Sequence, residues 1–177
     1  VWTENLGRAH RVAAAIEAFY VAQQQPEDWP VLRCSQIGEP CERKLWLEFR
    51  WTTPLARHEG RTERLFQTGH REEFRMIADL RSIGCEVQHV DPATGGQWRV
   101  SFLSGVFKGS ADGIASNVPG AEKTEHLLEC KTHNDKSYQD WRRKGVEQSK
   151  PMHFAQMQVY MHGLGLTRAL YIAHNKN

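Results

Sequence analysis

Two stretches decide the fold of this 177-residue chain, Gly109-Ser-Ala-Asp-Gly-Ile114 and Leu127-Leu-Glu-Cys-Lys-Thr132. Each places a polar residue inside an apolar run that is typical of a β-strand. Side chains alternate between the two faces of a strand, so Glu129 and Lys131 point the same way. A neighbouring strand can bring Asp112 beside them. Two carboxylates and one ammonium at one spot suit a hard divalent cation and a phosphate, and therefore predict metal-assisted hydrolysis of a phosphodiester.

Composition indicates one globular domain. Apolar residues make up 40% of the chain and charged residues 25%, which is ordinary for a chain with a packed core. The formal net charge is only +2, so any binding of nucleic acid must come from local basic patches. No run of about 18 apolar residues predicts a membrane helix, and no secretory signal is visible near Val1.

Hydrophobic periodicity and turn residues predict a mixture of helices and strands. We expect helices at residues 5–23, 41–50, 58–83, 135–146 and 150–163, and strands near 85–90, 97–103, 105–116, 125–132 and 168–174. Residues 91–96 are interpreted as a hairpin connection between the first two strands, and Gly84 as the cap of the long helix. The predicted fold class is α/β (α+β), with a central mixed sheet flanked by helices. We expect a single domain over 1–177, with an N-terminal helical region at 1–57 and a core at 58–177 that continues beyond Asn177.

The long helix carries a third candidate acid. Glu73 falls near the middle of an apolar stripe, at about 100° per residue, that comprises Leu65, Phe66, Met76, Ile77, Leu80 and Ile83. A carboxylate aimed at a core is costly unless a positive group meets it, so Glu73 is either half of a buried ion pair or a metal ligand. Gly69, one turn earlier on the same side, favours the metal ligand because it allows backbone or DNA to approach.

Two further groups of polar residues have both an ordinary and a functional interpretation. Gln156 and Tyr160 are four residues apart and therefore neighbours on a helix surface, either on the rim of the core or in the site. His70 lies a turn before the acid of the long helix, and His133 follows the strand predicted at 125–132. Each histidine is either a proton-transfer group or an ordinary polar residue.

Basic residues gather on the helix predicted at 41–50 and in the segment that follows residues 127–132. Basic side chains contact phosphates, and aromatic rings stack on unpaired bases, so these residues are candidates for DNA binding. A solvated helix face is the alternative interpretation. The candidate DNA-binding residues are Arg43, Lys44, Lys108, Trp141, Arg142, Arg143, Lys144 and Lys150.

The motifs in this order resemble the PD-(D/E)xK nuclease superfamily, and they are similar to its RecB-like and lambda-exonuclease (YqaJ-type viral recombinase) branch. The resemblance covers about residues 60–175 and rests on Gly69-x3-Glu73, Asp112, Glu129-Cys-Lys131 and Gln156-x3-Tyr160. Ala111 stands where the family has proline. Residues 35–46 also look like the helix that leads into the core of RecB-type nucleases.

The resemblance implies a restriction-endonuclease-like core and a metal-dependent deoxyribonuclease, namely an exonuclease of phage or bacterial recombination or repair. It implies DNA, a single-strand annealing or recombination protein and further copies of the chain as partners, and no membrane. The expected location is the cytoplasm of a bacterial cell or of a phage-infected host. Two alternatives stay open: a non-catalytic DNA-binding or assembly module on the same fold, and an endonuclease of restriction type.

The resemblance also implies a role for each residue. The catalytic residues would be Asp112, Glu129, Lys131, Gln156 and Tyr160. One or two Mg²⁺ or Mn²⁺ ions would be held by Glu73, Asp112, Glu129 and the backbone carbonyl of Cys130. Lys131 would orient the attacking water and offset charge on the phosphoryl oxygens, while Gln156 and Tyr160 would position the nucleophile or the DNA backbone.

The four cysteines do not provide a metal cluster. They stand at positions 34, 41, 85 and 130, without a CxxC pair and without the spacing of a zinc module. In some relatives a cysteine placed like Cys41 joins three later cysteines to hold an iron–sulfur cluster, which needs four thiolates. No cysteine follows Cys130 in this sequence, so we expect reduced thiols and no cluster.

Overall fold

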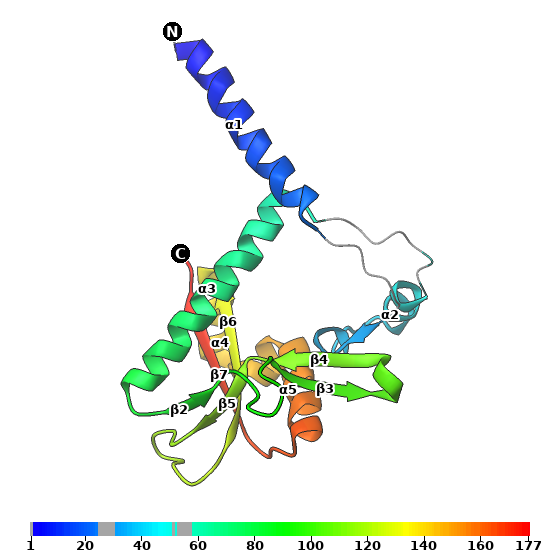
Figure 1. Ribbon diagram of the computed structural model, residues 1–177, viewed down its shortest axis with the longest axis vertical. Coiled ribbons are helices and arrows are strands. Elements are labelled where there is room, and N and C mark those ends of the chain that lie inside the picture. The colour runs from blue at the N-terminus through cyan, green and yellow to red at the C-terminus, as the bar shows by residue number, and fades with distance from the viewer. Residues whose placement is uncertain (1, 25–30, 51, 53–57) are drawn as a thin grey trace.

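The computed structural model describes residues 2–24, 31–50, 52 and 58–177, and side chains within these ranges from His10 onward (Figure 1). Its helices are α1 (Trp2–Ala22), α2 (Glu42–Phe49), α3 (Gly60–Ser82), α4 (Asp135–Ser149) and α5 (Pro151–Leu164). Its strands are β1 (Leu32–Arg33), β2 (Glu86–Gln88), β3 (Trp98–Phe102), β4 (Phe107–Ala111), β5 (Gly113–Ser116), β6 (His126–His133) and β7 (Ala169–Asn175). Short 3-10 turns η1 (Cys34–Gln36) and η2 (Leu103–Gly105) follow β1 and β3. The fold is mixed α/β and compatible with the predicted α+β class.

The strands form two mixed sheets and not the single sheet that we expected. Strands β1, β4 and β3 make a three-stranded sheet in the order β1-β4-β3, and the other four make a sheet in the order β2-β5-β6-β7. The strand predicted at 105–116 breaks at Asp112, so that β4 belongs to one sheet and β5 to the other. A Cβ atom on Gly113 would lie 2.9 Å from the carbonyl oxygen of Gln88, so this glycine lets β5 begin close to the end of β2. The two sheets therefore separate at Asp112.

The prediction of a hairpin at residues 91–96 is wrong. The flanking strands β2 and β3 lie in different sheets, where they pair with β5 and β4. The loop closes on itself, because the Asp91 amide donates to the Gly96 carbonyl oxygen at 2.8 Å and the Gly95 amide donates to the Asp91 carbonyl oxygen at 2.8 Å. The turn residues thus determine only a local reversal of the chain, whereas the pairing partner of each strand is determined by tertiary packing.

Helix α3 packs on the four-stranded sheet with only its C-terminal half. Met76, Ile77 and Leu80 are buried in the core between α3 and the sheet, whereas Leu65 and Phe66 are 44% and 48% exposed. Ile83, also expected on the buried stripe, is 62% exposed, and the predicted cap Gly84 follows it with a φ of 90°. The N-terminal half of α3 extends away from the sheets and packs against α1 (Figure 1).

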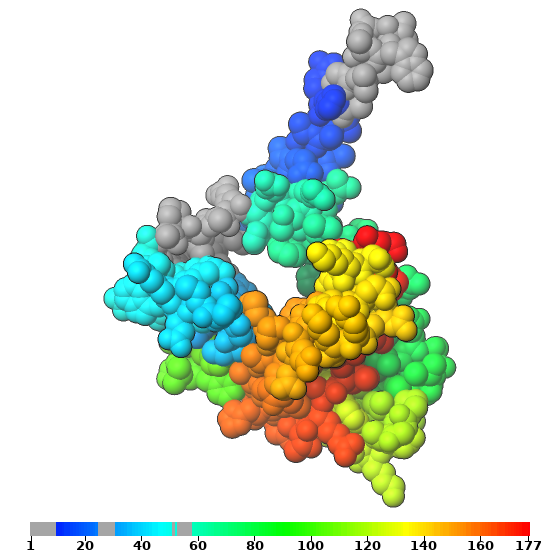
Figure 2. Space-filling view, turned by 180° about the vertical axis from the view of Figure 1, so that it is seen from behind, coloured from blue at the N-terminus to red at the C-terminus, as the bar shows by residue number. Residues whose placement is uncertain are grey.

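Helix α5 forms a second core with the three-stranded sheet and the opposite face of β6. Met157 and Tyr160 of α5 are buried there with Val100, Ala111 and Leu127. Seen from behind, the molecule has an opening between α2, the N-terminal half of α3 and the helices α4 and α5 (Figure 2). None of the described helices is long and apolar enough to cross a membrane.

Candidate active site

The candidate site lies in the fork where the two sheets separate. Strand β5 begins at Gly113, opposite Leu128 of β6, so β6 has no β5 partner beyond this pair. Asp112 stands at the fork and its Oδ2 atom accepts a hydrogen bond of 2.7 Å from the Cys130 amide. A carboxylate here satisfies a backbone donor that the sheet leaves unpaired. The fork thereby brings Asp112 next to the strand that carries Glu129 and Lys131.

Glu129 is completely buried beside Lys131. The Lys131 ammonium donates to Glu129 Oε1, and Glu129 Oε2 is buried without a hydrogen-bond partner among the described residues. Burial, assisted by the charge of Asp112, raises the pKa of Glu129 to about 7, although Lys131 opposes the rise. Burial tends to lower the pKa of Lys131, but the two carboxylates outweigh it and raise this pKa, so the amine stays protonated.

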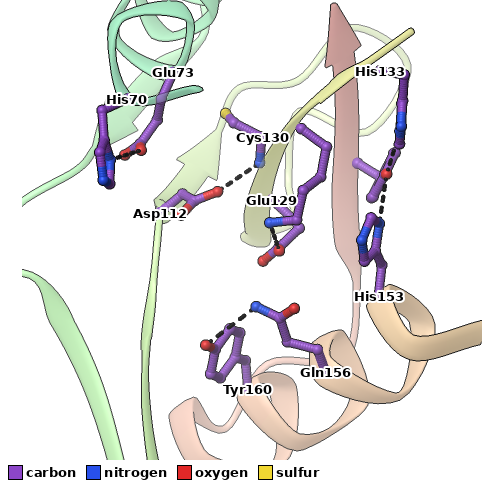
Figure 3. A network of polar contacts seen from close by, with 11 residues as sticks. His70, Glu73, Asp112, Glu129, Cys130, His133, His153, Gln156 and Tyr160 are labelled. Carbon is purple, nitrogen blue, oxygen red and sulfur yellow. Dashed lines mark hydrogen bonds and ion pairs between the residues drawn. The ribbon is translucent and has the colours of Figure 1, made fainter. Parts of the chain in front are cut away.

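Glu73 reaches the same site from α3. Figure 3 shows Asp112 between Glu73 on one side and Cys130 and Glu129 on the other. Burial, and then the charge of Asp112, raise the pKa of Glu73, whereas His70 lowers it from a distance of 3.7 Å between Nδ1 and Oε2. Among the described residues no lysine or arginine forms an ion pair with Glu73, so the structure does not show the buried pair that we considered. His70 itself is exposed.

The charge of this site is not balanced by its own residues. Burial also raises the pKa of Asp112, and Lys131 and the Cys130 amide counteract the rise. When the carboxylates of Glu73, Asp112 and Glu129 are all ionised, the single ammonium of Lys131 leaves two negative charges uncompensated. A bound divalent cation would supply the missing charge, and the unpartnered Glu129 Oε2 would have a ligand to bind.

The donors fit a hard cation better than a soft one. As the side chains stand, the described residues contain no group of three or more His, Cys, Asp or Glu side chains arranged to hold a metal ion. The carboxylates at the fork are oxygen donors, which suit Mg²⁺ or Mn²⁺. The Cys130 thiol is packed in the core against α3, and burial raises its pKa, so it is no thiolate ligand.

Gln156 and Tyr160 form the wall opposite β6. They face Glu129 from α5 (Figure 3), both are buried, and the Gln156 amide donates to Tyr160 Oη at 3.2 Å. Burial raises the pKa of Tyr160, so its phenol is neutral and keeps a proton to donate. A Cβ atom on Gly109 would lie 2.7 Å from Tyr160 Oη and 2.8 Å from Cys34 Cβ, so β4 approaches this closely because residue 109 is glycine.

Sequence analysis missed His153 and Tyr171, which join His133 beside the site. Tyr171 Oη lies 2.8 Å from His133 Nε2 and 2.9 Å from His153 Nδ1, and Ser137 Oγ lies 3.1 Å from His133 Nδ1. Burial lowers the pKa of both histidines to about 4, so they are neutral at neutral pH. Tyr171 is the ladder partner of Glu129. Two sequence patterns bear on the histidines. Positions 129, 131 and 133 share one face of a strand, and positions 153, 156 and 160 share one face of a helix.

Most of the candidate DNA-binding residues lie on exposed helices. On α4, Asp140 pairs with Arg143 at 3.2 Å and with Lys144 at 2.9 Å, whereas Arg142 is exposed and has no ion pair among the described residues. The Trp141 ring packs on Tyr171, with 5.7 Å between centroids. The basic cluster of α4 is therefore partly neutralised, and its tryptophan belongs to the packing of the domain.

The remaining candidates are on other elements. Arg43 and Lys44 are exposed on α2, where Lys44 pairs with Glu39 at 2.6 Å. Lys150 caps the N-terminus of α5 through its backbone and is half-buried, and Lys108 is exposed on β4.

The fork combines charges that suit the hydrolysis of a phosphate ester. Three carboxylates that lack balancing charge would bind a cation, and the protonated Lys131 can donate to an anionic oxygen. Comparison with protein-family models finds no match, and comparison with curated proteins finds none either. The functional assignment therefore rests on the residues of the fork.

Proposed function

We propose that this chain is a metal-dependent deoxyribonuclease with a restriction-endonuclease-like core, of the PD-(D/E)xK type that its motifs resemble. One observation carries the proposal: Glu129 is completely buried next to Asp112 and Lys131 at the fork, and its Oε2 atom has no hydrogen-bond partner in the described part of the chain. A fold alone gains nothing from a buried carboxylate oxygen without a partner. The buried Glu129 oxygen is explained if the site takes up a cation.

Oxygen atoms of Asp112, Glu129 and Glu73, with the carbonyl of Cys130, would hold one or two Mg²⁺ or Mn²⁺ ions. When bound, such an ion supplies Lewis acidity and lowers the pKa of a bound water. Lys131 is a hydrogen-bond donor and a positive charge in this site, not a base, because the carboxylates keep it protonated. Its ammonium orients the attacking water and offsets charge that develops on the phosphoryl oxygens.

The wall formed by α5 positions the substrate. The Gln156 amide donates to Tyr160 Oη, so the hydroxyl proton of Tyr160 is free for another acceptor. A non-bridging oxygen of a phosphodiester is such an acceptor. Burial of both side chains holds the donor in one place before the substrate arrives. The resemblance of the motifs makes DNA the proposed substrate, and removal of nucleotides from an end, in phage or bacterial recombination or repair, the proposed activity.

The decisive experiment incubates the purified chain with end-labelled linear DNA and with closed circular DNA, in Mg²⁺, in Mn²⁺ and in EDTA. We expect degradation of linear DNA alone, and only with metal. Cleavage of circles would instead indicate an endonuclease of restriction type. DNA binding without cleavage in any divalent metal would indicate a non-catalytic module and overturn the proposal.

The matched control is Asp112→Asn. The asparagine side chain retains an oxygen that accepts from the Cys130 amide, so the fold keeps this contact while the site loses one charge. Activity that survives this substitution at the wild-type level would come from a contaminating nuclease or from another site. Loss of cleavage with a melting temperature no lower than that of the wild type supports the fork as the catalytic centre.

A further inference from the structure

One face of the three-stranded sheet carries positive charge. Val100 of β3 is buried in the core, so Arg99 and Ser101, at the alternate positions, lie on the opposite face. The ladder places Ser101 next to Lys108 of β4, and Lys108 next to Arg33 of β1. Three cations and a hydroxyl are therefore neighbours on a single exposed face.

A groove follows this face and reaches the candidate active site. It has a volume of about 740 Å³ and is lined by Arg33, Ser35, Arg99, Ser101, Lys108 and Tyr160, among others. No carboxylate lines it among the described residues. Tyr160 also forms the α5 wall of the site through its bond to Gln156. A ligand in the groove therefore ends beside the residues that face Glu129.

The positive charge of the groove is not explained by the stability of the fold. Arg99 and Lys108 are exposed, and neither forms an ion pair with any described residue. On α4, by contrast, Asp140 compensates two of the basic residues. An anionic ligand accounts for the charges of Arg99 and Lys108, which no described residue compensates.

We infer that the groove binds the sugar–phosphate backbone of a single DNA strand beside the phosphate to be cleaved. The inference rests on the proposed nuclease function and names the form in which its substrate lies. A volume of this size, typical of small-molecule pockets, takes a few nucleotides of one strand and not a duplex. In the ladder Arg99 lies opposite Ser110, which is two residues after Lys108 on β4. The charges of Arg99 and Lys108 are therefore offset by about 7 Å in the strand direction. This spacing is comparable with that of successive phosphates in an extended strand.

The test measures binding in EDTA, so that no cleavage is required. Fluorescence anisotropy of a labelled oligothymidylate of about ten nucleotides is recorded over a range of KCl concentrations for the wild-type chain and for Arg99→Ala/Lys108→Ala. Each phosphate contact of a single strand contributes about 0.7 to the salt slope, so the double variant should lose about 1.4. The control Lys123→Ala/Arg168→Ala removes two exposed cations that precede β6 and β7, and should keep the wild-type slope.

The outcomes separate the groove from the nuclease function. A double variant with wild-type slope and affinity, a control that loses as much as the groove variant, or a wild-type chain that binds no oligonucleotide overturns the inference. Tighter binding of oligouridylate than of oligothymidylate overturns the assignment to DNA. If the groove variant loses the predicted slope but the wild-type chain cuts no DNA in any metal, the groove stands and the nuclease falls. If the chain cuts DNA and the slope is unaffected, the nuclease stands and the groove falls.

Discussion

Replacement of Lys131 by alanine tests the ion pair and the chemistry of the fork together. The Lys131 ammonium donates to Glu129 Oε1. Glu129 is completely buried, and no residue that the structure describes binds its other oxygen. Removal of one partner of a buried pair leaves an uncompensated charge and costs about 3–5 kcal/mol. In a chain of 177 residues this lowers the melting temperature by about 10 °C. If Lys131 also stabilises charge on the phosphoryl group, the rate of cleavage falls by about 10²–10³-fold.

The loss of stability should depend on pH in a defined direction. Burial raises the pKa of Glu129 to about 7 in the folded chain even with Lys131 present. A carboxyl group whose folded pKa is raised binds a proton on folding, so its burial is least costly at low pH and most costly above the folded pKa. Lys131→Ala should therefore lose less stability at pH 5, where Glu129 is neutral with or without Lys131, than at pH 8, where Glu129 of the wild type is charged and paired with Lys131.

The assay compares wild-type, Lys131→Ala and the double variant Lys131→Met/Glu129→Gln by calorimetry and by single-turnover cleavage below the lowest melting temperature. The double variant replaces both charges by neutral side chains of similar size and should recover most of the stability but none of the activity. An unchanged melting temperature of Lys131→Ala would refute the ion pair. Cleavage at the wild-type rate by that variant would refute the role of Lys131. A double variant as unstable as the single one would refute the uncompensated charge as the cause.

Three further predictions concern the neighbouring residues. Glu73→Gln removes a carboxylate whose charge is disfavoured first by burial and then by Asp112, so at pH 8 the melting temperature should rise by about 2–4 °C, or about 1 kcal/mol, while metal-dependent cleavage falls. A lower melting temperature would contradict this cost of the charge. Calorimetric titration with Mn²⁺ should show about tenfold weaker binding at pH 6 than at pH 8, because Glu129 has a pKa of about 7 and must release its proton to bind a cation. Equal affinities at the two pH values would argue against Glu129 as a ligand. Gly109→Ala should lower stability by about 1–3 kcal/mol in urea unfolding, since its Cβ would lie 2.7 Å from Tyr160 Oη. In the control Gly69→Ala the Cβ meets no described residue within 4 Å apart from its chain neighbours and the backbone of its own helix, so this variant should raise the stability of α3 by about 0.5–1 kcal/mol. Equal effects of the two substitutions would refute the close approach at β4.

Local sequence patterns predicted the helices and most of the strands of this fold with small shifts at their ends, but they missed β1 and joined β4 and β5 into one strand. The helix expected at 58–83 spans Gly60–Ser82, and the strand expected at 125–132 spans His126–His133. Periodicity, capping residues and turn residues act over a few neighbours in the chain, so they are visible in the sequence. The same periodicity placed Glu129 and Lys131 on one face of a strand, because the alternation of side chains is a property of the strand alone.

Other expectations failed where a distant part of the chain decides the outcome. The periodicity of α3 is the same along its whole length, yet Leu65 and Phe66 are exposed and Met76 is buried, because the sheet covers only one half of the helix. The run at 105–116 has the residues of one strand, but β4 and β5 pair with different neighbours and separate at Asp112. A local pattern carries no information about which surface will cover it.

Interactions between near neighbours in the chain thus specified the α-helices, most of the strands, and the acids and amine that stand on them. The tertiary structure added the break between β4 and β5 at Asp112 and the complete burial of Glu129. It also added the fork, where the Cys130 amide donates to the Asp112 carboxylate. It also set β1 beside β4, which gathers Arg33 and Lys108 in one groove. The physical reason is range: hydrogen bonding within an element and side-chain alternation act between near neighbours, whereas burial and electrostatic coupling arise only when segments distant in the chain come into contact.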